Sequence, residues 1–352
     1  MNSLGSSSRL ARPPFLAADI GGTHARVALV RAAHDREDGV ELVAYREFEC
    51  ADFPSLATLL QIFVAEAANG ASIRNGVLAV GGQVLGGSVI NDNLAWPIRL
   101  WQVRQALAFD EVVALNDFEA LGYARESDMK RGARLLWGAD TGSKGAPTLV
   151  VGPGTGLGAA VCLPAVGGRV LTTEAGQMDF SPCSPRERAI AAHLAPDGGY
   201  VAYEQIVSGP GLLTLYTTLC GLDGVSPRLA TPEAVTAAAM TATDIRASEA
   251  VQVFCAALGS FVGDIVLAHM AFGGVYLAGG FLSSMFGLLE RSAFVERFLH
   301  GRSARTLLLP VPIRVVEHGR YGVLGAANWY LARVVAGANV EFPGDAGSDA
   351  AA

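Results

Sequence analysis

The spacing of apolar residues along the chain predicts both strands and helices. Short apolar runs beside glycine or polar residues indicate buried strands, and apolar residues that recur every three or four positions indicate helices. The predicted strands are 15–20, 27–30, 76–80, 112–115, 148–151, 159–163, 275–278 and 311–316. The predicted helices are 54–68, 97–109, one from Phe118 onward, 248–271 and 322–335, with further helix starts at Ser184, Ser208 and Thr231. This mixture indicates an α/β fold.

One supersecondary unit occurs twice, which suggests two similar domains that face one cleft. Residues 20–29 align with residues 152–161 when Gly22-Thr23 is placed over Gly154-Thr155, and each copy is a strand, a glycine turn and a second strand. Between the copies, residues 81–87 are predicted to be a glycine-rich turn. Residues 125–144 are polar and irregular, as expected of a crossing between domains. A chain of 352 residues is also long enough for about two domains.

Two small polar residues, Asn116 and Asp117, separate a predicted strand from a predicted helix. In open α/β sheets, ligands bind beyond the carboxyl ends of the strands. An aspartate in that position can accept a proton from an attacking hydroxyl group. The alternative is that Asp117 only caps the following helix. This stretch alone favours capping, whereas the motifs in the rest of the chain favour a catalytic base.

Three glycine-rich turns predict a nucleotide site. They lie at residues 19–23, 154–158 and 278–280. Glycine lets successive main-chain N–H groups approach phosphate oxygens. Each turn alone could be only a tight hairpin, but their recurrence favours phosphate binding. The sequence holds no G-x-x-x-x-G-K-[ST] motif, so the chain is not a P-loop enzyme.

A dinucleotide-binding site is a competing interpretation of the second turn. Residues 154–159 satisfy the G-x-G-x-x-A pattern, and Glu174 lies at the spacing of a ribose ligand. That pattern must open a helix. Residues 159–163 run into Pro164 and a Gly-Gly turn, which leaves too little chain for a helix. The sequence therefore disfavours this alternative.

Composition narrows the class of protein. A formal net charge of −7 with scattered arginines argues against a nucleic-acid partner. Five cysteines without a C-x-x-C pair indicate buried thiols in a reducing compartment rather than disulfides or a zinc site. Residues 265–289 carry no formal charge, but glycine and serine pairs interrupt them, so we expect a buried helix, turn, strand and turn instead of a membrane span. We expect a cytoplasmic protein with a flexible leader at 1–14 and a disordered tail at 343–352.

Two further acidic residues, Glu174 and Glu204, are candidates for substrate binding. Carboxylates and amides can share hydrogen bonds with adjacent hydroxyl groups, as a polyhydroxyl substrate requires. Either glutamate could equally be a solvated surface charge. The histidines His24, His269 and His318 lack metal-ligand spacing, and we interpret them as ordinary residues.

Six motifs together resemble the bacterial glucokinase family. They follow the family's order, at residues 19–26, 115–120, 152–158, 173–182, 208–212 and 277–280. The resemblance implies the hexokinase–actin–Hsp70 fold, a two-domain ribonuclease H-like α/β fold with a central interdomain cleft, usually as a homodimer. On this basis we expect a small domain at 15–124 plus 321–338 and a large domain at 125–320.

The resemblance also implies a reaction and roles for residues. It implies an ATP-dependent hexose kinase that phosphorylates the 6-hydroxyl of glucose, with Asp117 as general base and Mg²⁺ oriented through water by Asp19. The sugar-binding residues implied are Asn116, Glu174, Gln177 and Glu204. The nucleotide-binding residues implied are Ala18, Asp19, Ile20, Gly21, Gly22, Thr23, Gly154, Thr155, Gly156, Gly279 and Gly280.

The sequence departs from the family pattern in three places. Gln177 stands where the family usually has a sugar-binding histidine, His24 replaces a usual asparagine, and residues 81–84 replace a more usual glycine-proline pattern. The cysteine–histidine zinc cluster of the related repressor/kinase group is absent from the sequence. The alternatives left open are a catalytically weak sugar-binding regulator on the same fold, or a kinase for a different hexose.

Overall fold

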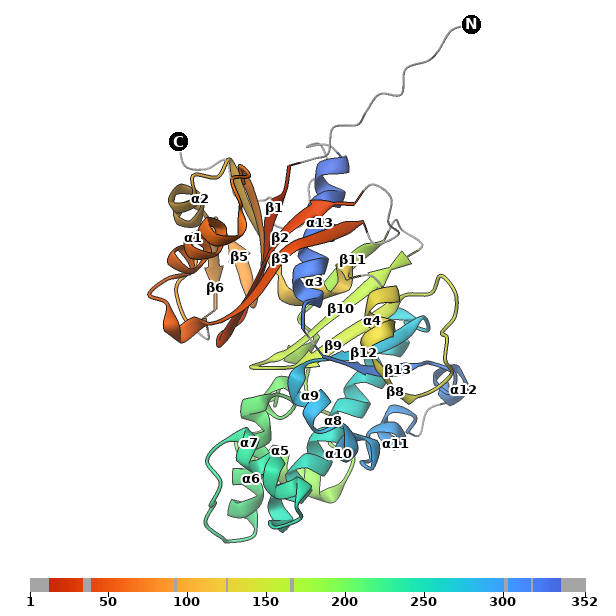
Figure 1. Ribbon diagram of the computed structural model, residues 1–352. Helices are drawn as coiled ribbons and strands as arrows, with labels where there is room; N and C mark the ends of the chain where they lie inside the picture. The colour runs from red at the N-terminus through yellow and green to blue at the C-terminus, as the bar shows by residue number, and fades with distance from the viewer. Residues whose placement is uncertain are drawn as a thin grey trace, which may run out of the picture. The chain divides into compact units, whose positions relative to one another are not determined.

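The chain forms two compact α/β units in the computed structural model (Figure 1). Unit 1 consists of residues 1–125 and 320–352, and unit 2 of residues 126–319. The structure describes residues 13–33, 39–91, 94–124, 126–164, 168–300, 303–317 and 319–336. Most of the predicted leader, the whole predicted tail, Asp92, Asn93 and His318 lie outside these described residues.

Unit 1 is built on a five-stranded sheet in the order β3-β2-β1-β4-β7. β1, β2 and β3 pair antiparallel, whereas β1, β4 and β7 run parallel. The central strand β1 is buried on both faces: Leu16, Ala18 and Ile20 contribute to one apolar cluster, and Phe15 and Ala17 to the other. The strand bounds are β1 Phe15–Ile20, β2 His24–Ala32, β3 Val40–Glu49, β4 Asn75–Val80 and β7 Glu111–Asn116.

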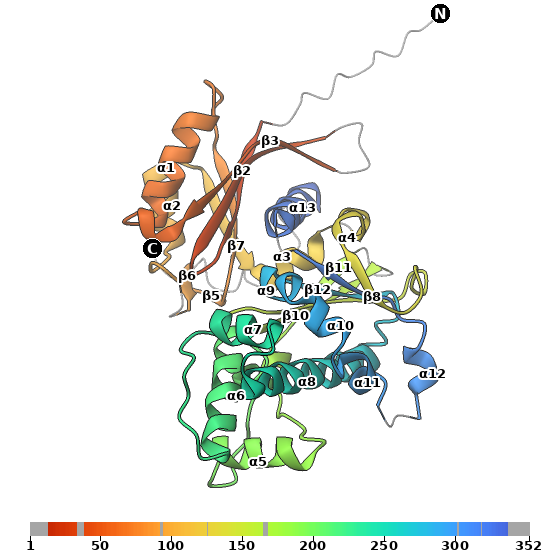
Figure 2. The same ribbon diagram turned by 60° about the horizontal axis from the view of Figure 1, so that its bottom comes forward.

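Helices cover both faces of this sheet (Figure 2). α1 (Leu56–Ala67) and α2 (Leu100–Leu107) supply the cluster on one face, and α3 (Asp117–Tyr123) and α13 (Tyr321–Ala336) supply the other. α3 and α13 cross very closely, because a Cβ atom on Gly325 would lie 1.7 Å from the Ala120 carbonyl oxygen. The last described helix is therefore an integral part of unit 1. The 3-10 turn η1 (Cys50–Asp52) joins β3 to the α1 region.

Unit 2 repeats this strand order with one addition. Its sheet runs β11-β10-β9-β12-β13-β8; β9, β10 and β11 are antiparallel neighbours, and β9, β12 and β13 are parallel. β8 pairs antiparallel with β13 at the edge. The predicted repeat of the hairpin is thus part of a repeated five-strand pattern. The strand bounds are β8 Arg134–Trp137, β9 Thr148–Pro153, β10 Leu157–Leu163, β11 Arg169–Thr173, β12 Gly274–Ala278 and β13 Ile313–Val316.

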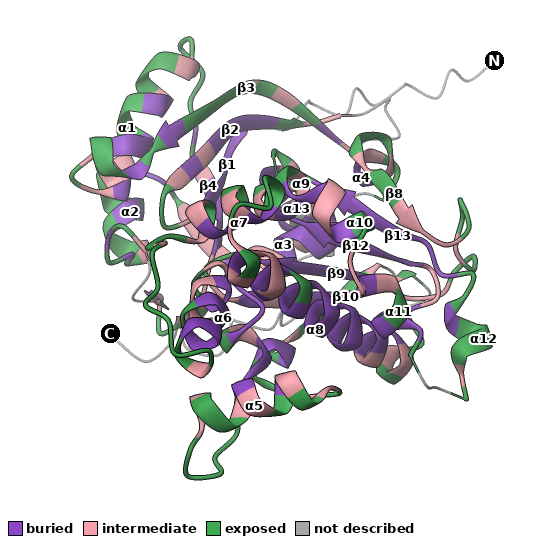
Figure 3. Ribbon diagram, turned by 90° about the horizontal axis from the view of Figure 1, so that it is seen from below, coloured by how far each residue is buried: buried purple, intermediate pink, exposed green. Residues whose placement is uncertain are grey.

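The helices of unit 2 pack around the long helix α8 (Ile245–His269), most of which is buried (Figure 3). Its length and composition would allow it to cross a membrane, but 83% of its most apolar window is buried inside the protein, as in a core helix. Residues 265–289 contain the end of α8 and then β12, the helix and strand that we expected, but the second expected turn holds the short helices α9 and α10. The other bounds are α4 Glu126–Gly132, η3 Ala175–Gln177, α5 Pro185–Leu194, η4 Tyr203–Gln205, α6 Gly209–Leu222, α7 Pro232–Met240, α9 Gly280–Ser284, α10 Phe286–Glu290, α11 Phe294–Phe298 and α12 Arg305–Leu308.

The predicted helix starts are confirmed by their caps. The side chains of Ser55, Ser184, Ser208 and Thr231 each accept a hydrogen bond from a main-chain N–H in the first helical turn. Such caps satisfy donors that have no partner within the helix. In these places, short-range side-chain chemistry was enough to locate the helix.

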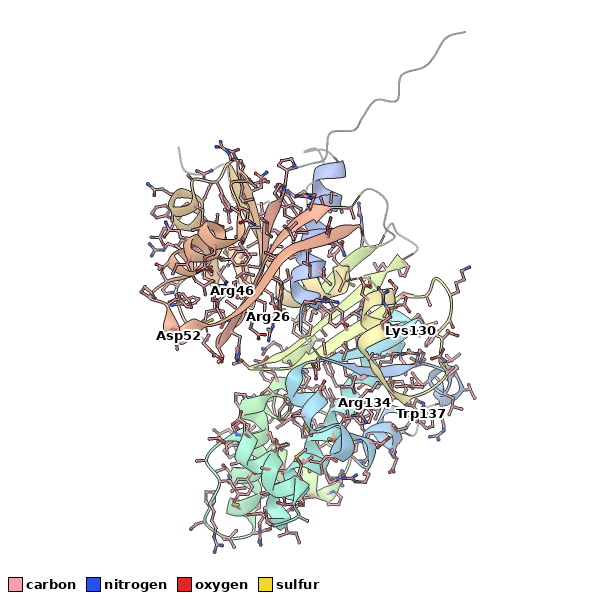
Figure 4. The ribbon with its side chains drawn as sticks, viewed as in Figure 1. Arg26, Arg46, Asp52, Lys130, Arg134 and Trp137 are labelled. Carbon is pink, nitrogen blue, oxygen red and sulfur yellow. The ribbon has the colours of Figure 1, made fainter. Side chains whose placement is uncertain are left out.

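Two predicted irregular segments contain regular structure. The glycine-rich turn at 81–87 holds the strand β5 (Gln83–Leu85), which pairs with β6 (Ser88–Ile90) across Gly86 and Gly87. Both glycines have positive φ, 55° and 73°, as a two-residue hairpin turn requires. The polar crossing at 125–144 holds α4 and β8. β8 is an edge strand with three apolar residues, and the guanidinium of its first residue, Arg134 (labelled in Figure 4), stacks 3.6 Å from the centroid of the Phe286 ring.

Two smaller predictions also needed correction. The helix predicted at 97–109 begins only at Leu100, because Arg99 is extended and bridges to Ser88. All five cysteines are free, but Cys183 is exposed and Cys162 half-buried, so only three are the buried thiols predicted. Cys183 lies in the loop that leads directly to the Ser184 cap of α5, away from the core.

Candidate active site

The residues of unit 1 that we expect to bind ligands lie at one edge of its sheet, at the carboxyl ends of three parallel strands. Ile20 of β1 is paired with Val80 of β4, and Val80 is paired with Asn116 of β7. The ends of β1 and β7 are therefore two strand spacings apart, about 10 Å. Asp19 and the Asn116–Asp117 turn share this edge, where ligands bind in open α/β sheets.

The turn after β7 presents Asp117 as the first residue of α3. The Asn116 side chain is the cap, because its Oδ1 accepts hydrogen bonds from the N–H groups of Phe118, at 2.9 Å, and Glu119, at 3.2 Å. The alternative that Asp117 serves as the helix cap is therefore wrong. The Asp117 side chain is only half-buried, and its Oδ1 accepts from the Phe118 N–H at 2.9 Å.

The main chain at Gly81, which has no side chain, lies against the Asp117 carboxylate. A Cβ atom on Gly81 would be 3.6 Å from Asp117 Oδ2 and 3.3 Å from Asn91 Nδ2. Asn91 donates to the Gly81 carbonyl at 3.1 Å, and Asn116 donates to the Gly82 carbonyl at 3.3 Å. The departure from the family pattern at 81–84 thus borders the candidate base. The sequence alone did not identify Asn91 as a neighbour of the candidate base.

Asp19 is a buried carboxylate, 3% exposed, that is held from two sides. Its partner across the β1–β2 ladder is Arg26, whose Nη1 lies 3.5 Å from Asp19 Oδ2 and whose Nη2 lies 2.8 Å from Glu47 Oε1 (Figure 4). At the start of α13, a Cβ atom on Gly322 would lie 2.7 Å from Asp19 Cγ. Only glycine lets this helix begin against the carboxylate, where the positive end of the helix dipole favours an anion.

The first glycine turn follows Asp19 and is open to solvent. The Gly21 N–H donates to the His24 carbonyl at 3.0 Å, and Gly22 and Thr23 at the tip are exposed. His24 lies beside Glu49, with 2.9 Å between His24 Nε2 and Glu49 Oε1. Ala18 and Ile20 are buried in the strand, so the tip rather than the strand offers N–H groups to a ligand.

The second glycine turn joins β9 to β10 in unit 2. Three residues, 154–156, separate the paired residues Pro153 and Leu157, whereas four separate Ile20 and Ala25 in the first hairpin. The aligned copies therefore differ by one residue at the turn. Residues 157–163 form a strand, so the helix that a dinucleotide fingerprint requires is absent from this described segment, and that alternative fails.

The third glycine turn lies beside the second. Gly279, with φ of 139°, follows β12, and a Cβ atom on it would be 3.6 Å from the Pro153 carbonyl oxygen. Gly280 opens α9 with no atom within 4 Å of its Cβ position. Because β9 and β12 are parallel neighbours, both turns lie at the same edge of the unit 2 sheet.

The three sugar-binding candidates of unit 2 lie on two short 3-10 turns at the base of the second hairpin. Glu174 and Gln177 are exposed at the two ends of the η3 region, and Glu204 is half-buried on η4. η3 packs against the hairpin, since a Cβ atom on Gly176 would lie 2.3 Å from the Leu157 carbonyl oxygen. The Tyr203 N–H donates to the Met178 carbonyl at 2.9 Å and joins the two turns.

Glu204 also touches the phosphate-binding candidate directly. Its Oε2 accepts from the Leu157 N–H at 3.4 Å, and a Cβ atom on Gly156 would lie 2.9 Å from that oxygen. The Gly209 N–H, at the start of α6, donates to the Gly154 carbonyl at 2.8 Å. The proposed sugar and phosphate residues of unit 2 therefore form one connected group.

One ionisable residue of the site was missed by sequence reasoning. Glu119 is buried, and burial raises the pKa of its carboxyl to about 7, although hydrogen bonds from the Trp329 side chain and the Asn116 main chain oppose the shift. The N-x-x-E spacing of Asn116 and Glu119 is the available signal, because it matches a capping box.

Comparisons with known proteins show the family to which the chain belongs. The family model for glucokinase matches residues 16–333. A glucokinase-like protein from Xylella fastidiosa is 44% identical over 91% of this chain and 95% of its own length. The glucokinase of Stenotrophomonas maltophilia is 35% identical over 89% of this chain and 94% of its own length. The crystal structure of a glucokinase from an Antarctic psychrotroph, 28% identical, superposes with a TM-score of 0.77 over 91% of this chain and 99% of that one. The fold, the ordered motifs and these relatives lead to one conclusion: the chain belongs to the glucokinase family.

Proposed function

We propose that this protein is an ATP-dependent hexose kinase that phosphorylates the 6-hydroxyl group of glucose, with Asp117 as the general base. The observation that carries the proposal is the half-buried Asp117 carboxylate, at a capped strand end and beside side-chain-free backbone. Phosphoryl transfer depends mainly on positioning and on neutralising charge, with one carboxylate aligned on the acceptor hydroxyl. Asp117 accepts the hydroxyl proton as that oxygen attacks the terminal phosphorus and ADP leaves.

The glycine turns bind the phosphates in this proposal. The exposed turn tips at Gly22-Thr23 in unit 1 and Gly154-Thr155 in unit 2 supply main-chain N–H groups, and Gly279-Gly280 adds a third turn beside the second. Because the base belongs to unit 1 and two of the turns belong to unit 2, the reaction requires both units at one interdomain cleft. In this proposal unit 1 is the small domain and unit 2 is the large one.

Asp19 fits the role of a magnesium-orienting residue. Mg²⁺ keeps several water ligands and is bound through one or two carboxylates together with substrate phosphates. Among the described residues, no group of three or more His, Cys, Asp or Glu side chains could hold a metal ion. A single carboxylate beside a phosphate-binding turn suits an ion held largely by water and nucleotide. Bound there, the ion would neutralise charge on the phosphates.

The sugar is held by Asn116, Glu174, Gln177 and Glu204. Carboxylates and amides accept and share hydrogen bonds with neighbouring hydroxyl groups. Gln177 can donate one hydrogen bond and accept another but carries no charge. We expect the replacement of the family's usual histidine by Gln177 to alter the preference for one sugar over another. A panel of hexoses measures that preference.

The experiment measures ADP release with glucose, mannose, fructose and N-acetylglucosamine, for the wild type and Asp117→Asn. We expect glucose to give the largest kcat/KM. We expect Asp117→Asn to lower kcat by about a hundred- to ten-thousand-fold, because a general base contributes that much. Asp110→Asn, at the opposite end of β7, is the matched control: Asp110 is exposed and pairs with Arg74, so kcat should stay unchanged. An unchanged rate in Asp117→Asn would remove the assigned mechanism.

A sugar-binding regulator on the same fold is the second candidate, favoured by the neutral Gln177 on η3. It predicts that glucose raises the melting temperature while no hexose releases ADP. Turnover of any hexose well above the rate of Asp117→Asn would reject it.

A further inference from the structure

A buried ion pair in unit 2 takes no part in the chemistry described so far. Arg297 of α11 donates from Nη1 to Oε1 of Glu187, on α5, at 2.6 Å, and the two side chains are only 8% and 6% exposed. Burial of two charges costs free energy, and their attraction offsets that cost only when the remaining polar atoms of both groups also find partners. The pair therefore needs an explanation in terms of the contacts it makes.

Stability alone does not explain this pair. Replacement of a buried ion pair by apolar residues of similar volume is often neutral or stabilising. Here the guanidinium is also incompletely bonded, because Arg297 Nη2 is buried and has no hydrogen-bond partner among the residues that the structure describes. An unsatisfied buried donor is itself destabilising. What the pair does provide is a fixed direction for each oxygen of the Glu187 carboxylate.

Both oxygens of that carboxylate accept hydrogen bonds. Oε1 accepts from Arg297, and Oε2 accepts from the main-chain N–H of Cys183 at 2.7 Å. The Glu187 N–H in turn donates to the Ser184 side chain at 3.1 Å. Arg297 is itself fixed by α8, because its Nε donates to Ser260 Oγ at 3.0 Å. A series of bonds thus runs from the central helix α8 through Arg297 and Glu187 to the main chain that precedes α5.

The main chain fixed in this way is the end of a segment that carries two of the proposed sugar-binding residues. We call residues 174–184 the sugar segment. The structure describes all of it: Glu174 and Gln177 lie at η3, and the rest runs to α5 outside any helix or strand. Such a chain has no regular main-chain ladder to set its course, so individual hydrogen bonds set it.

Two anchors hold the sugar segment. The first is the η4 region, where the Tyr203 N–H donates to the Met178 carbonyl at 2.9 Å and the Phe180 N–H donates to the Val201 carbonyl at 2.7 Å. The second, at the end of the segment, is the Glu187 carboxylate. A segment that loses one anchor samples more conformations, and a ligand that orders it then binds more weakly.

We propose that Glu187 is a positioning residue for the sugar, which holds the end of the sugar segment so that Glu174 and Gln177 keep their places in the site. Arg297 orients Glu187. The inference rests on the proposed function, from which it takes the two sugar-binding residues, and it assigns the ion pair no contact with sugar or nucleotide. Its effect falls on KM for glucose, because the sugar segment carries neither the proposed base nor a phosphate-binding turn.

The test compares two double variants that differ in one hydrogen-bond acceptor. In Glu187→Met/Arg297→Met, apolar side chains replace both charges, and the Cys183 N–H loses its acceptor. In Glu187→Gln/Arg297→Met, the charges are also gone, but the glutamine oxygen can still accept from that N–H. Because neither variant leaves a buried charge unpaired, their melting temperatures should lie within about 5 °C of each other.

We expect steady-state kinetics to separate the two variants. KM for glucose should rise about ten- to a hundredfold in Glu187→Met/Arg297→Met, the equivalent of one hydrogen bond to a charged group. In Glu187→Gln/Arg297→Met it should stay within about threefold of the wild type, and in both variants kcat and KM for ATP should change by less than about threefold. A merely structural role predicts no such difference, because both variants have lost the same ion pair.

Arg186→Met is the matched control on the same helix. The Arg186 guanidinium, in a side chain that is 35% exposed, pairs with Asp223 at 2.8 Å and with Glu249 at 2.9 Å. The substitution loosens the attachment of α5 to the neighbouring helices but leaves the bond between Glu187 and Cys183 in place. We expect a lower melting temperature and an unchanged KM for glucose.

Hydrogen exchange keeps the proposal testable if Glu187→Met/Arg297→Met does not fold. In the wild type without sugar, the Cys183 N–H should exchange about a hundredfold more slowly than an unprotected amide, because a fixed carboxylate accepts from it. Exchange of this N–H at the rate of an unprotected amide would show that Glu187 does not hold the sugar segment.

Two kinetic results would also overturn the inference. They are equal KM values for glucose in the two double variants, and a rise of KM in Arg186→Met as large as that in Glu187→Met/Arg297→Met. Titration calorimetry with glucose separates this inference from the proposed function. If the wild type binds glucose but no hexose releases ADP, the kinase proposal fails, and the Kd of glucose in the double variants replaces KM. If Asp117→Asn is inactive while the double variants match in KM, only the positioning role fails.

Discussion

The two glycine hairpins of the molecule share a strand pattern but obtain their acidic neighbour in different ways. In the β1–β2 hairpin the acid is internal: Asp19 lies in β1, its cross-strand partner is Arg26, and α13 begins against it. In the β9–β10 hairpin the acid comes from another part of the chain: Glu204 on η4 reaches the turn through one bond of 3.4 Å to the Leu157 N–H.

This difference separates a fixed charge from a movable one. Asp19 is enclosed by a strand partner and a helix start, so its position is set by the fold. Glu204 is half-buried and held to the turn by a long hydrogen bond, so a ligand with hydroxyl groups can compete for it. The β1–β2 hairpin, with its fixed carboxylate, is thus suited to hold a cation beside the phosphates. The β9–β10 hairpin is suited to bind a phosphate group in the turn itself.

Of the changes that test this comparison, removal of the fixed charge of Asp19 should have the largest effect on the kinetics. We expect Asp19→Asn to lower kcat/KM for MgATP by about a hundred- to a thousandfold, the usual cost of losing one preorganised electrostatic group. Glu47→Gln is the matched control, because Glu47 also pairs with Arg26 but is 45% exposed in its side chain, and it should stay close to the wild type. Steady-state kinetics at varied MgATP decide the matter, and equal losses in both variants would show that Asp19 acts only through Arg26.

Neutralising the movable charge of Glu204 should weaken the binding of glucose and strengthen the binding of ADP. We expect Glu204→Gln to raise KM for glucose by about ten- to a hundredfold, because hydrogen bonds to a charged group are worth about 1.5–3 kcal/mol. ADP should bind the sugar-free variant more tightly at low salt, because the carboxylate no longer repels phosphate in the turn. Titration calorimetry without sugar measures this directly. Glu174→Gln on the neighbouring η3 should weaken only sugar binding, and an ADP affinity unaffected by Glu204→Gln would contradict the contrast drawn here.

A pair of glycine substitutions in one turn should have the smallest effect. Alanine at Gly156 places a Cβ atom 2.9 Å from Glu204 Oε2, whereas alanine at Gly154 meets no atom within 4 Å. We expect Gly156→Ala to raise KM for glucose by about fivefold, the equivalent of about 1 kcal/mol, and Gly154→Ala to leave it unchanged. If the two variants shift KM for glucose equally, the Glu204 contact is not what restricts position 156.

The parts of the site that depend on local sequence could be predicted. Both hairpins, the Asn116–Asp117 turn and four helix caps follow from apolar spacing and from small polar residues at helix starts, because these interactions join residues a few positions apart. The same local rules missed β5 and β6, although Gly86-Gly87 between them is a hairpin signal.

The contacts that position the acids could not be predicted in this way. Glu204 lies 47 residues from Leu157, and Gly322 meets Asp19 across nearly the whole chain. The pairing of Asp19 with Arg26 depends on a strand register, which a one-residue change in the turn would alter. The two hairpin turns do differ by one residue, so the alignment of the sequences alone did not determine the pairing.

The place of α13 in unit 1 has a consequence for how the protein is made. The residues of β1, β4 and α3 that form the inner cluster with Val323, Ala326 and Trp329 are synthesised long before that helix leaves the ribosome. Domains usually fold as units while the chain emerges. Here unit 1 cannot be completed until the whole of unit 2 has been translated, and one apolar face of its sheet stays uncovered until then. Nascent chains released before α13 should therefore be the ones that chaperones capture.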